Sequence, residues 1–293
     1  MKTYKETFKD AKEKLIDPLG KQLAEEVEWW KLTNLTEGED LEYPVAVLGK
    51  GVPLLMLHGF DSSFLEFRRL VPLLAKNNMI IIPDLFGFGF CPRPLNTTYG
   101  KKKILLHLNK IIERLNSKAP VGLIGASMGG AIAMELARQN PAKINRLLLL
   151  SPAGLTGRQQ PLPPLIDQIG VWFLSQPCIR KSLCNQAFAN PKESVGEQEK
   201  QIASIHLQVP GWKESLAAFA RQGGIANCGS PIPPQQLQIL WGGKDKILKG
   251  KVKQETFQML GCYIEEIEEC GHLPHLDCPS LVARKWQTGS LTA

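Results

Sequence analysis

A serine stands between two glycines in the stretch GASMG, Gly125 to Gly129, where a short apolar run gives way to a helical pattern. A turn that joins a strand to a helix within so few residues is tight, and glycines on either side allow the backbones to approach closely. Such a turn would present the hydroxyl of Ser127 above a sheet as a nucleophile. A serine in a phosphate-binding glycine-rich turn is the alternative, so other residues must decide.

A serine hydroxyl is a weak nucleophile at neutral pH, and it needs a base to take its proton. Of the five histidines, His272 follows the last predicted strand, in ECGHLPHLDCP, and we predict it to be the base. His107 falls in a predicted helical run and His206 in the run IASIHLQ of a proline-rich segment, where surface or packing roles are favoured. His58 ends an early strand, and His275 lies just beyond the predicted base.

The base needs an acid that orients its ring. Asp245, in LQILWGGKDKI, follows a predicted strand between Ser127 and His272, and we predict it to be this acid. Asp84 and Asp277 are the alternatives. Asp84 is expected to hold the turn LFGFG that follows it, and Asp277 is too close to the histidine in sequence to reach behind the ring easily.

An ester under attack also needs two N–H donors for the oxygen that becomes negatively charged. The amide of Met128 directly follows the serine at the start of a predicted helix, where the helix dipole is positive. The loop after the apolar run LLMLHGF supplies the second donor, which we predict to be the amide of Phe60.

Aromatic residues gather near these positions. Phe86 and Phe88 follow the predicted strand MIIIPD, and Trp172 and Phe173 lie in a segment rich in proline. We predict that these four side chains line an apolar substrate pocket. Charged substrates are expected to be poor, because no buried counter-ion for them is apparent.

Alternating strands and helices must position these residues. Apolar runs separated by amphipathic patterns indicate a parallel sheet covered on both faces. The strand-like runs are YPVAVLGKG, VPLLMLHGF, MIIIPD, VGLIG, INRLLLLSPAG, LQILWGGKD and CYIEEIEECGH, and the helical runs between them include SFLEFRRLVPLLAKN, KKKILLHLNKIIERLN and residues 252–260.

Two segments depart from this alternation. Residues 3–32 predict two short amphipathic helices. Residues 155–234 hold nine of the 21 prolines and no strong strand run, and their large aromatic residues need burial. We therefore predict an N-terminal helical extension over residues 1–35, an α/β core over 36–154 and 235–293, and an inserted helical cap over 155–234.

The composition is that of a globular protein, with 293 residues that are 43% hydrophobic and 22% charged. Seven cysteines without a C-x-x-C pair predict free thiols in a reducing compartment. Cys262, Cys270 and Cys278 recur at even spacing, but no cluster of histidine ligands accompanies them, so no metal is predicted. No signal peptide and no membrane-spanning run is apparent, which predicts a cytoplasmic protein.

The net charge of +7 is scattered along the chain. Without a nucleic-acid motif or a basic stripe interleaved with aromatic residues, it predicts a solvated surface and no nucleic-acid partner. Weak peripheral attraction to an anionic membrane stays open as an alternative. The oligomeric state is not indicated.

The motifs HGF, PDLFGFG, GASMGG, WGGKD and GHLPHLDCP resemble, in this order, those of the α/β-hydrolase family, over about residues 43–286. The resemblance implies a central, mostly parallel eight-stranded sheet with the cap over its C-terminal edge. It also implies the chain order serine, acid, histidine, which Ser127, Asp245 and His272 follow. Serine in place of aspartate at the elbow excludes the chemistry of haloalkane dehalogenases and epoxide hydrolases.

Within this family, the motifs of the chain resemble those of two groups in particular. Chlorophyll dephytylases and pheophytinases pair a similar HGF loop with a similar ending, where Asp277 replaces their glutamate. Carbon–carbon bond hydrolases share a similar elbow, usually with asparagine at the position of Ala126. We predict a serine hydrolase that cleaves a small hydrophobic carboxylic ester through an acyl-enzyme, without a cofactor. A phytyl-ester hydrolase, a carbon–carbon bond hydrolase and a non-catalytic ligand-binding protein remain alternatives.

Overall fold

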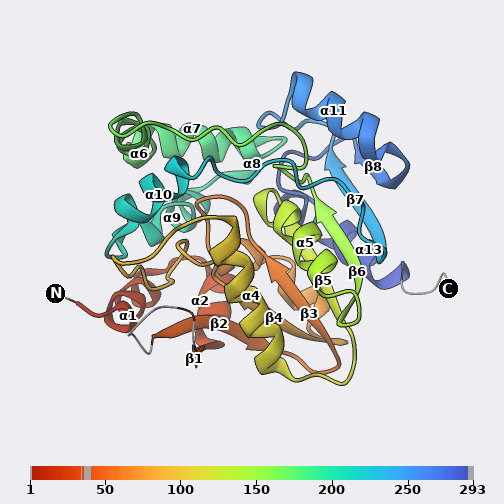
Figure 1. Cartoon of the computed structure of the whole chain (residues 1–293), viewed down its shortest axis with the longest axis horizontal. Helices are drawn as coiled ribbons and strands as arrows, with labels where there is room; N and C mark the ends of the chain where they lie inside the picture. Colours follow the sequence, from red (N-terminus) through yellow and green to blue (C-terminus); the bar gives the residue numbers. More distant parts are fainter. Residues whose placement is uncertain (1, 34, 36–40, 290–293) are drawn as a thin grey trace.

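A single twisted sheet organises the part of the chain that the computed structural model describes, residues 2–33, 35 and 41–289. Its strands are β1 (Val27–Lys31), β2 (Glu42–Leu48), β3 (Val52–Leu57), β4 (Asn78–Pro83), β5 (Val121–Ala126), β6 (Ile144–Leu150), β7 (Gln236–Gly242) and β8 (Ile264–Ile267). Their spatial order is β1-β2-β4-β3-β5-β6-β7-β8. Strand β2 runs antiparallel to both neighbours, and the remaining pairs are parallel. The predicted eight-stranded, mostly parallel sheet is confirmed (Figure 1).

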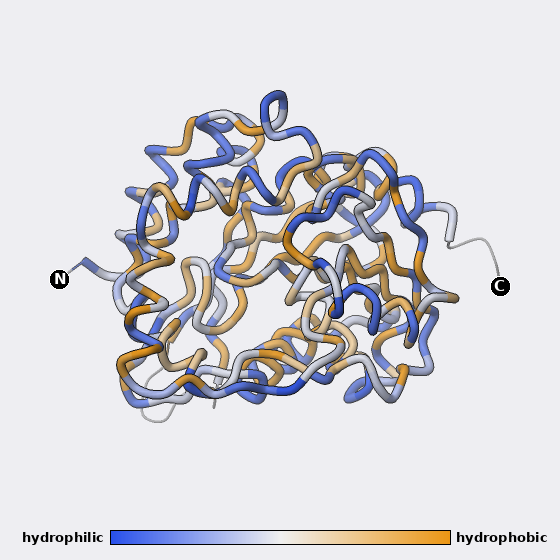
Figure 2. The backbone as a smooth tube through the Cα atoms, turned by 90° about the horizontal axis from the view of Figure 1, so that it is seen from above, coloured by the Kyte–Doolittle hydropathy of each residue, from blue (hydrophilic) through white to orange (hydrophobic). Residues whose placement is uncertain are grey.

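Helices flank the sheet. They are α1 (Tyr4–Lys14), α2 (Pro18–Glu25), the 3-10 helix η1 (Phe64–Phe67), α3 (Val71–Leu74), α4 (Lys101–Leu115), α5 (Met128–Gln139), α11 (Gly250–Leu260), the 3-10 helix η3 (Gly261–Tyr263), α12 (Pro274–Asp277) and α13 (Pro279–Thr288). In Figure 2 the colour of the outer coils changes repeatedly between hydrophilic and hydrophobic along the chain, as expected for helices with one buried face.

A second group of helices lies within residues 155–234, which we call the insertion. They are α6 (Ile166–Ser175), α7 (Pro177–Ala187), α8 (Pro191–Ser194), α9 (Glu197–Ile202), the 3-10 helix η2 (Ile205–Gln208) and α10 (Trp212–Arg221). Figure 1 shows them together along the upper side of the molecule, over the end of the sheet toward which the parallel strands point. The helices of the insertion therefore lie over the C-terminal edge of the sheet, where the cap was predicted.

Alternation along the strands divides the core into two layers. In β3, Leu55 and Leu57 belong to the hydrophobic cluster on one face of the sheet, and Leu54 and Met56 belong to the cluster on the other. All four side chains are fully buried. A strand that is apolar on both faces is expected where helices cover both faces of a parallel sheet.

The prediction for the N-terminal extension is wrong in one part. Helices α1 and α2 form as expected, but Val27–Lys31 is a strand, β1, which pairs with β2. The sequence VEWWK places Trp30 on the buried side, whereas Glu28 and Lys31 are exposed. Pairing with the edge of β2 satisfies the backbone groups of this segment, an interaction that helical periodicity does not reveal.

A buried arginine joins three distant parts of the chain. Arg68 donates to Asp17, the N-cap of α2, at 2.9 Å and to Glu199 of α9 at 2.9 Å. Its side chain is 1% exposed, so the two carboxylates neutralise a positive charge that is buried away from solvent. These contacts attach the insertion to the core next to the site described below. No helix among the described residues has the length and apolar character that crossing a bilayer requires.

Candidate active site

Ser127 occupies a strained turn between β5 and α5. Its backbone has φ 49° and ψ −118°, a conformation that residues other than glycine rarely adopt. A Cβ on Gly125 would lie 2.5 Å from the carbonyl oxygen of Gly129, and a Cβ on Gly129 would lie 2.1 Å from the carbonyl oxygen of Leu57. Only glycine fits at these two positions, which explains why both flank the serine.

The three residues predicted as a triad lie in hydrogen-bonding contact. Nε2 of His272 is 2.9 Å from Oγ of Ser127, and its Nδ1 is 2.8 Å from Oδ2 of Asp245. Because a carboxylate only accepts, Nδ1 carries the proton and Nε2 is left to accept from the serine hydroxyl. All three residues follow strands of the sheet at its C-terminal edge, after β5, β7 and β8.

The carboxylate of Asp245 is held from both sides. Its Oδ1 accepts from the amides of Ile247 at 2.8 Å and Leu248 at 3.0 Å, while its Oδ2 faces His272. Burial acts to raise the pKa of Asp245, but the hydrogen bonds from His272 and the two amides outweigh burial and leave the pKa below its ordinary value. Asp245 therefore favours its ionised form, in which it accepts from Nδ1 of His272.

The loop that carries the histidine is anchored by Asp277. Its Oδ2 accepts from the amide of Gly271 at 2.7 Å and from that of Ala189 at 2.9 Å. The amide of His272 itself donates to the carbonyl oxygen of Ala187 at 2.8 Å. Asp277, an alternative candidate for the acid, thus binds backbone amides and ties the end of α7 to the histidine loop.

The other alternative acid, Asp84, accepts from the amides of Phe64 and Phe90, each at 2.6 Å. It therefore holds the turn after β4, which is the role we predicted for it. The pKa of Asp84 is raised to about 7, because complete burial outweighs the effect of these two hydrogen bonds.

Two amides next to the serine are available for a developing oxyanion. Neither the amide of Met128, at the start of α5, nor that of Phe60 donates to an acceptor within the described residues. The loop of Phe60 passes directly against the serine, because a Cβ on Gly59 would lie 3.4 Å from the Cβ of Ser127. This loop is held by His58, which accepts from the amide of Leu85 at 3.0 Å.

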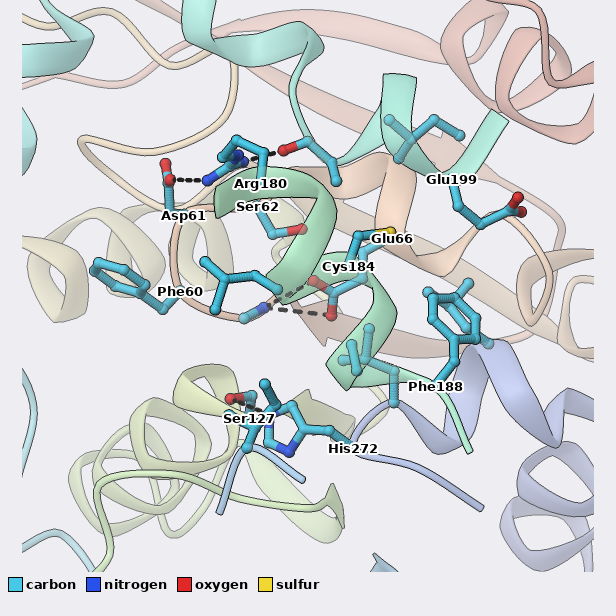
Figure 3. A pocket seen from close by; sticks show the side chains of 18 of the residues that line it. Phe60, Asp61, Ser62, Glu66, Ser127, Arg180, Cys184, Phe188, Glu199 and His272 are labelled. Carbon is cyan, nitrogen blue, oxygen red and sulfur yellow. Dashed lines mark hydrogen bonds and ion pairs between the residues drawn. The ribbon is translucent and has the colours of Figure 1, made fainter. Parts of the chain in front are cut away.

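A cavity of about 240 Å³ opens from Ser127 toward the insertion (Figure 3). One side of its wall is apolar and comes largely from the insertion and the histidine loop. These residues are Leu174, Leu183, Ala187, Phe188, Ile202, Ala203, Ile247, Leu273 and Leu276. The other side comes from the loop after β3 and from charged residues. These are Gly59, Phe60, Asp61, Ser62, Glu66, Arg68, Arg180 and Glu199.

The four aromatic residues predicted to line the pocket do not line this cavity. Phe86 is buried beneath α4 and stacks on Tyr99 with ring centroids 5.5 Å apart. Phe88 is also buried, and it packs behind Phe60 with centroids 5.9 Å apart.

Trp172 and Phe173 lie on the outside of α6, where they are 60% and 50% exposed. Proximity in sequence to a functional loop does not determine which side of the wall a ring occupies. The cavity takes its apolar surface instead from Phe188 and from aliphatic residues of α6, α7, α9 and the loops that carry Asp245 and His272.

The expectation that the pocket lacks buried cations is also wrong. Arg68 and Arg180 both line the cavity, and their side chains are 1% and 10% exposed. Each is paired, however, with a carboxylate in the same wall. Arg180 donates to Asp61 at 2.5 Å, and Arg68 donates to Glu199. The charges of this wall therefore largely neutralise one another.

Asp61 contacts three side chains from the insertion, and the sequence analysis did not identify it. Besides Arg180, it accepts from Nε1 of Trp212 at 2.8 Å, and its Oδ1 lies 3.1 Å from Nε2 of His206. Burial acts to raise the pKa of Asp61, but the hydrogen bond to His206 and the charge of Arg180 lower it far below its ordinary range. Its three partners are more than one hundred residues away in sequence, so no local pattern could identify them.

A second buried acid lies beneath the same loop. Nε2 of His275 is 3.0 Å from Oε1 of Glu66, and the amide of Gly59 donates weakly to this carboxylate at 3.4 Å. Burial acts to raise the pKa of Glu66, and the contact with His275 outweighs burial, so the pKa lies below its ordinary value. Glu66 and His275 therefore support the loop from behind.

Metal ligation is not suggested by the arrangement of the side chains. Among the described residues, no group of three or more histidine, cysteine or carboxylate side chains is placed to hold an ion. Cys262 is exposed, Cys270 is buried and Cys278 is intermediate, and all three thiols are free.

The sequence is similar to those of known hydrolases. The chain is 27% identical to the α/β hydrolase domain-containing protein VTE7 of Arabidopsis thaliana over 251 residues, covering 82% of this chain and 74% of that protein. It is 28% identical to the 2-hydroxymuconate semialdehyde hydrolase of Pseudomonas sp. strain CF600 over 248 residues, covering 78% and 83%.

Solved structures resemble the fold. A serine hydrolase involved in carbazole degradation, the CarC enzyme, superposes with a TM-score of 0.73 at 19% identity, covering 91% of this chain and 99% of that one. The epoxide hydrolase CorEH superposes with a TM-score of 0.71 at 20% identity, covering 89% and 97%.

A profile of the α/β hydrolase family matches residues 54–285, which include every residue of the Ser127–His272–Asp245 chain. With this match over most of the sequence, and with the sheet and insertion described above, the chain belongs to the α/β-hydrolase family.

Proposed function

We propose that this protein is a serine hydrolase that cleaves a hydrophobic carboxylic ester through an acyl-enzyme intermediate. The observation that carries the proposal is the hydrogen-bonded chain from Ser127 through His272 to Asp245 at the end of a largely apolar cavity. A serine, a base that accepts from it and an acid that orients the base form the arrangement that activates a hydroxyl.

In the first half of the reaction, Oγ of Ser127 attacks the ester carbonyl carbon while its proton moves to Nε2 of His272. The carbonyl oxygen becomes negatively charged and accepts from the amides of Met128 and Phe60. The bond to the alcohol oxygen then breaks, and His272 delivers its proton to that oxygen. The alcohol leaves, and the acyl group remains on Ser127.

In the second half, water attacks the acyl carbon while one of its protons moves to Nε2 of His272. The tetrahedral intermediate collapses, the bond to Oγ of Ser127 breaks, and the serine takes the proton back. The carboxylic acid leaves. Asp245 accepts from Nδ1 of the ring throughout, which keeps Nε2 free to take and return protons.

The apolar side of the cavity supports a hydrophobic ester as substrate. Leu174, Leu183 and Ile202 are side chains that gain from contact with an alkyl or prenyl group, because each methylene removed from water contributes about 0.8 kcal/mol. A phytyl ester, as in chlorophyll or pheophytin, belongs to this class and is one substrate within the proposal.

Labelling with a fluorophosphonate probe tests the proposal, because only an activated serine reacts with it. Wild-type protein should label, and Ser127→Ala should not. Ser62 offers a matched control, since it lines the same cavity but its hydroxyl contacts the carboxylate of Glu66 and not a histidine, and Ser62→Ala should label like the wild type. Absence of labelling in the wild type would instead favour a non-catalytic ligand-binding protein.

Carbon–carbon bond hydrolysis is a second candidate, favoured by the similarity to the semialdehyde hydrolase of Pseudomonas and by the arginines in the cavity wall. Both arginines are paired with carboxylates, which makes them less available to a charged substrate. Comparing kcat/KM for an alkyl ester and for a 2-hydroxymuconate semialdehyde distinguishes the two candidates.

A further inference from the structure

An apolar surface covers the outer side of the insertion. Helix α6 and the residue before it expose five large apolar side chains, far more than a helix that only covers a core would expose. Their exposed fractions are 68% for Leu165, 51% for Ile166, 60% for Ile169, 60% for Trp172 and 50% for Phe173. Their spacing places them on one face of the helix, and we call them the α6 surface. Val171, on the other face, is buried, and α6 packs there against α10.

The exposed charged residues that flank α6 along the chain, from residue 157 to residue 192, are basic. From residue 157 to residue 192 the only acidic residue is Asp167, which is 1% exposed and paired with Arg221 of α10. The exposed charged residues of the same stretch are Arg158, Lys181 and Lys192. An apolar helix face with aromatic residues and flanking cations has the composition of a helix that lies in the interface of an anionic bilayer.

The α6 surface adjoins the wall of the cavity. Leu174, the next residue along α6, lines the cavity that contains Ser127, and so does Leu183 of α7. Leu183 is also 37% exposed, so it belongs to both the cavity wall and the outer surface. Figure 1 shows α6 and α7 side by side at the outer edge of the insertion. A hydrophobic molecule beside α6 would therefore be close to the cavity.

We propose that the α6 surface docks on the face of an anionic lipid bilayer and holds the cavity next to it. The role in delivering substrate rests on the proposed hydrolysis of a hydrophobic ester, whereas docking itself does not. A second copy of the chain is a weaker occupant, because both copies carry the same net charge of +7 and repel each other. Lipid phosphates would instead neutralise these charges.

Sedimentation with vesicles tests the docking. Wild-type protein should pellet with vesicles of equal parts phosphatidylglycerol and phosphatidylcholine, and less with phosphatidylcholine alone or at high salt. The variant Ile169→Glu/Trp172→Glu should bind the anionic vesicles more weakly by about tenfold or more, since two apolar side chains no longer insert. Val52→Glu is the matched control, because Val52 is 51% exposed at the start of β3, at the edge of the sheet away from the insertion. This variant should bind like the wild type.

Tryptophan fluorescence locates the contact. Trp172 is the most exposed of the six tryptophans, since Trp29 is half-buried and the others are buried. A quencher attached to lipid chains in the anionic vesicles should reduce the wild-type emission. Trp172→Phe should pellet with these vesicles but lose most of the quenching.

Wild-type protein that stays in the supernatant, or a double variant that pellets like the wild type, overturns the proposal. The proposal is also overturned if light scattering finds that the wild type is a dimer and the double variant a monomer, and neither protein binds vesicles. Two measurements separate docking from hydrolysis. Ser127→Ala should bind vesicles without cleaving any ester, and Ile169→Glu/Trp172→Glu should cleave a short water-soluble ester at the wild-type rate. Vesicle binding without any ester cleavage by the wild type would contradict the proposed function and leave docking supported.

Discussion

Arg180 of the insertion donates a 2.5 Å hydrogen bond to Asp61, the residue that follows Phe60 in the loop after β3. The two side chains are 10% and 4% exposed. Arg180 also donates to the carbonyl oxygen of Ala203, between α9 and η2. A single buried ion pair therefore couples the position of the insertion to the loop whose Phe60 amide we propose as an oxyanion donor.

Removing the charge of Asp61 should destabilise the fold. Asparagine tolerates the positive φ of 47° at this position, so Asp61→Asn tests the charge rather than the backbone. The variant leaves Arg180 buried without its carboxylate, and the free energy of unfolding in urea should fall by about 3–5 kcal/mol. Adding Arg180→Met should recover part of this loss, because the unpaired cation is then gone.

A solvent-exposed pair provides the control for this experiment. Lys244→Met breaks the contact with Glu269, whose side chain is 78% exposed, and should change stability by less than about 1 kcal/mol. If Asp61→Asn proved as stable as the wild type, the pair would not hold the insertion.

Asp245→Asn should lower kcat by about 10⁴-fold while the fold stays intact. An amide would donate to Nδ1 of His272 and favour the tautomer that cannot accept from Ser127. Kinetics with a chromogenic ester measure the loss, and circular dichroism checks the fold. Asp84→Asn should act mainly on stability, because Asp84 binds the amides of Phe64 and Phe90. Full activity in Asp245→Asn, with a folded but inactive Asp84→Asn, would show that the acid has been misassigned.

The apolar side of the cavity should select for longer acyl chains. Each added methylene that leaves water contributes about 0.8 kcal/mol, so kcat/KM should rise about fourfold per carbon until the cavity is full. Leu174→Trp should move the maximum to shorter chains, because Leu174 lines the cavity. Phe86→Leu should lower stability without moving it, because Phe86 lies in the core. A profile that peaks at acetate in the wild type would favour a small-ester enzyme.

Acid should destabilise the protein through His107. This ring is fully buried with no hydrogen-bond partner among the described residues, and burial lowers its pKa to about 3. The unfolded chain, with a pKa of about 6.5, binds the proton more readily, so stability present above pH 6.5 is lost as pH falls toward 3.

The substitution His107→Leu isolates this contribution, because every other titrating group stays. At pH 5, about 1.5 units below the pKa of 6.5, protonation of the unfolded wild type lowers its stability by about 2 kcal/mol. The free energy of unfolding of the variant minus that of the wild type should therefore be about 2 kcal/mol larger at pH 5 than at pH 8. Urea unfolding at both values measures it. A difference between variant and wild type that did not change with pH would mean that His107 binds a proton equally well in both states.

The sequence alone predicted the sheet and the residues that meet at its edge, because both depend on local patterns. Ser127 and Asp245 follow apolar runs that form strands, His272 follows the short strand β8, and the glycines around Ser127 are required by backbone contacts within a few ångströms. Parallel strands bring their carboxyl ends to one edge, so residues that follow them come together whatever lies between them in the chain.

The tertiary structure alone decided the walls of the cavity and the supports of its loops. Asp61 meets Arg180 and Trp212 across more than one hundred residues, and β1 forms only because β2 offers an edge. Periodicity could show that Phe86 and Trp172 are apolar, but not that one ring enters the core and the other faces outward. Which side of a wall a residue occupies depends on how separate elements pack, and that information is not local to any segment of the chain.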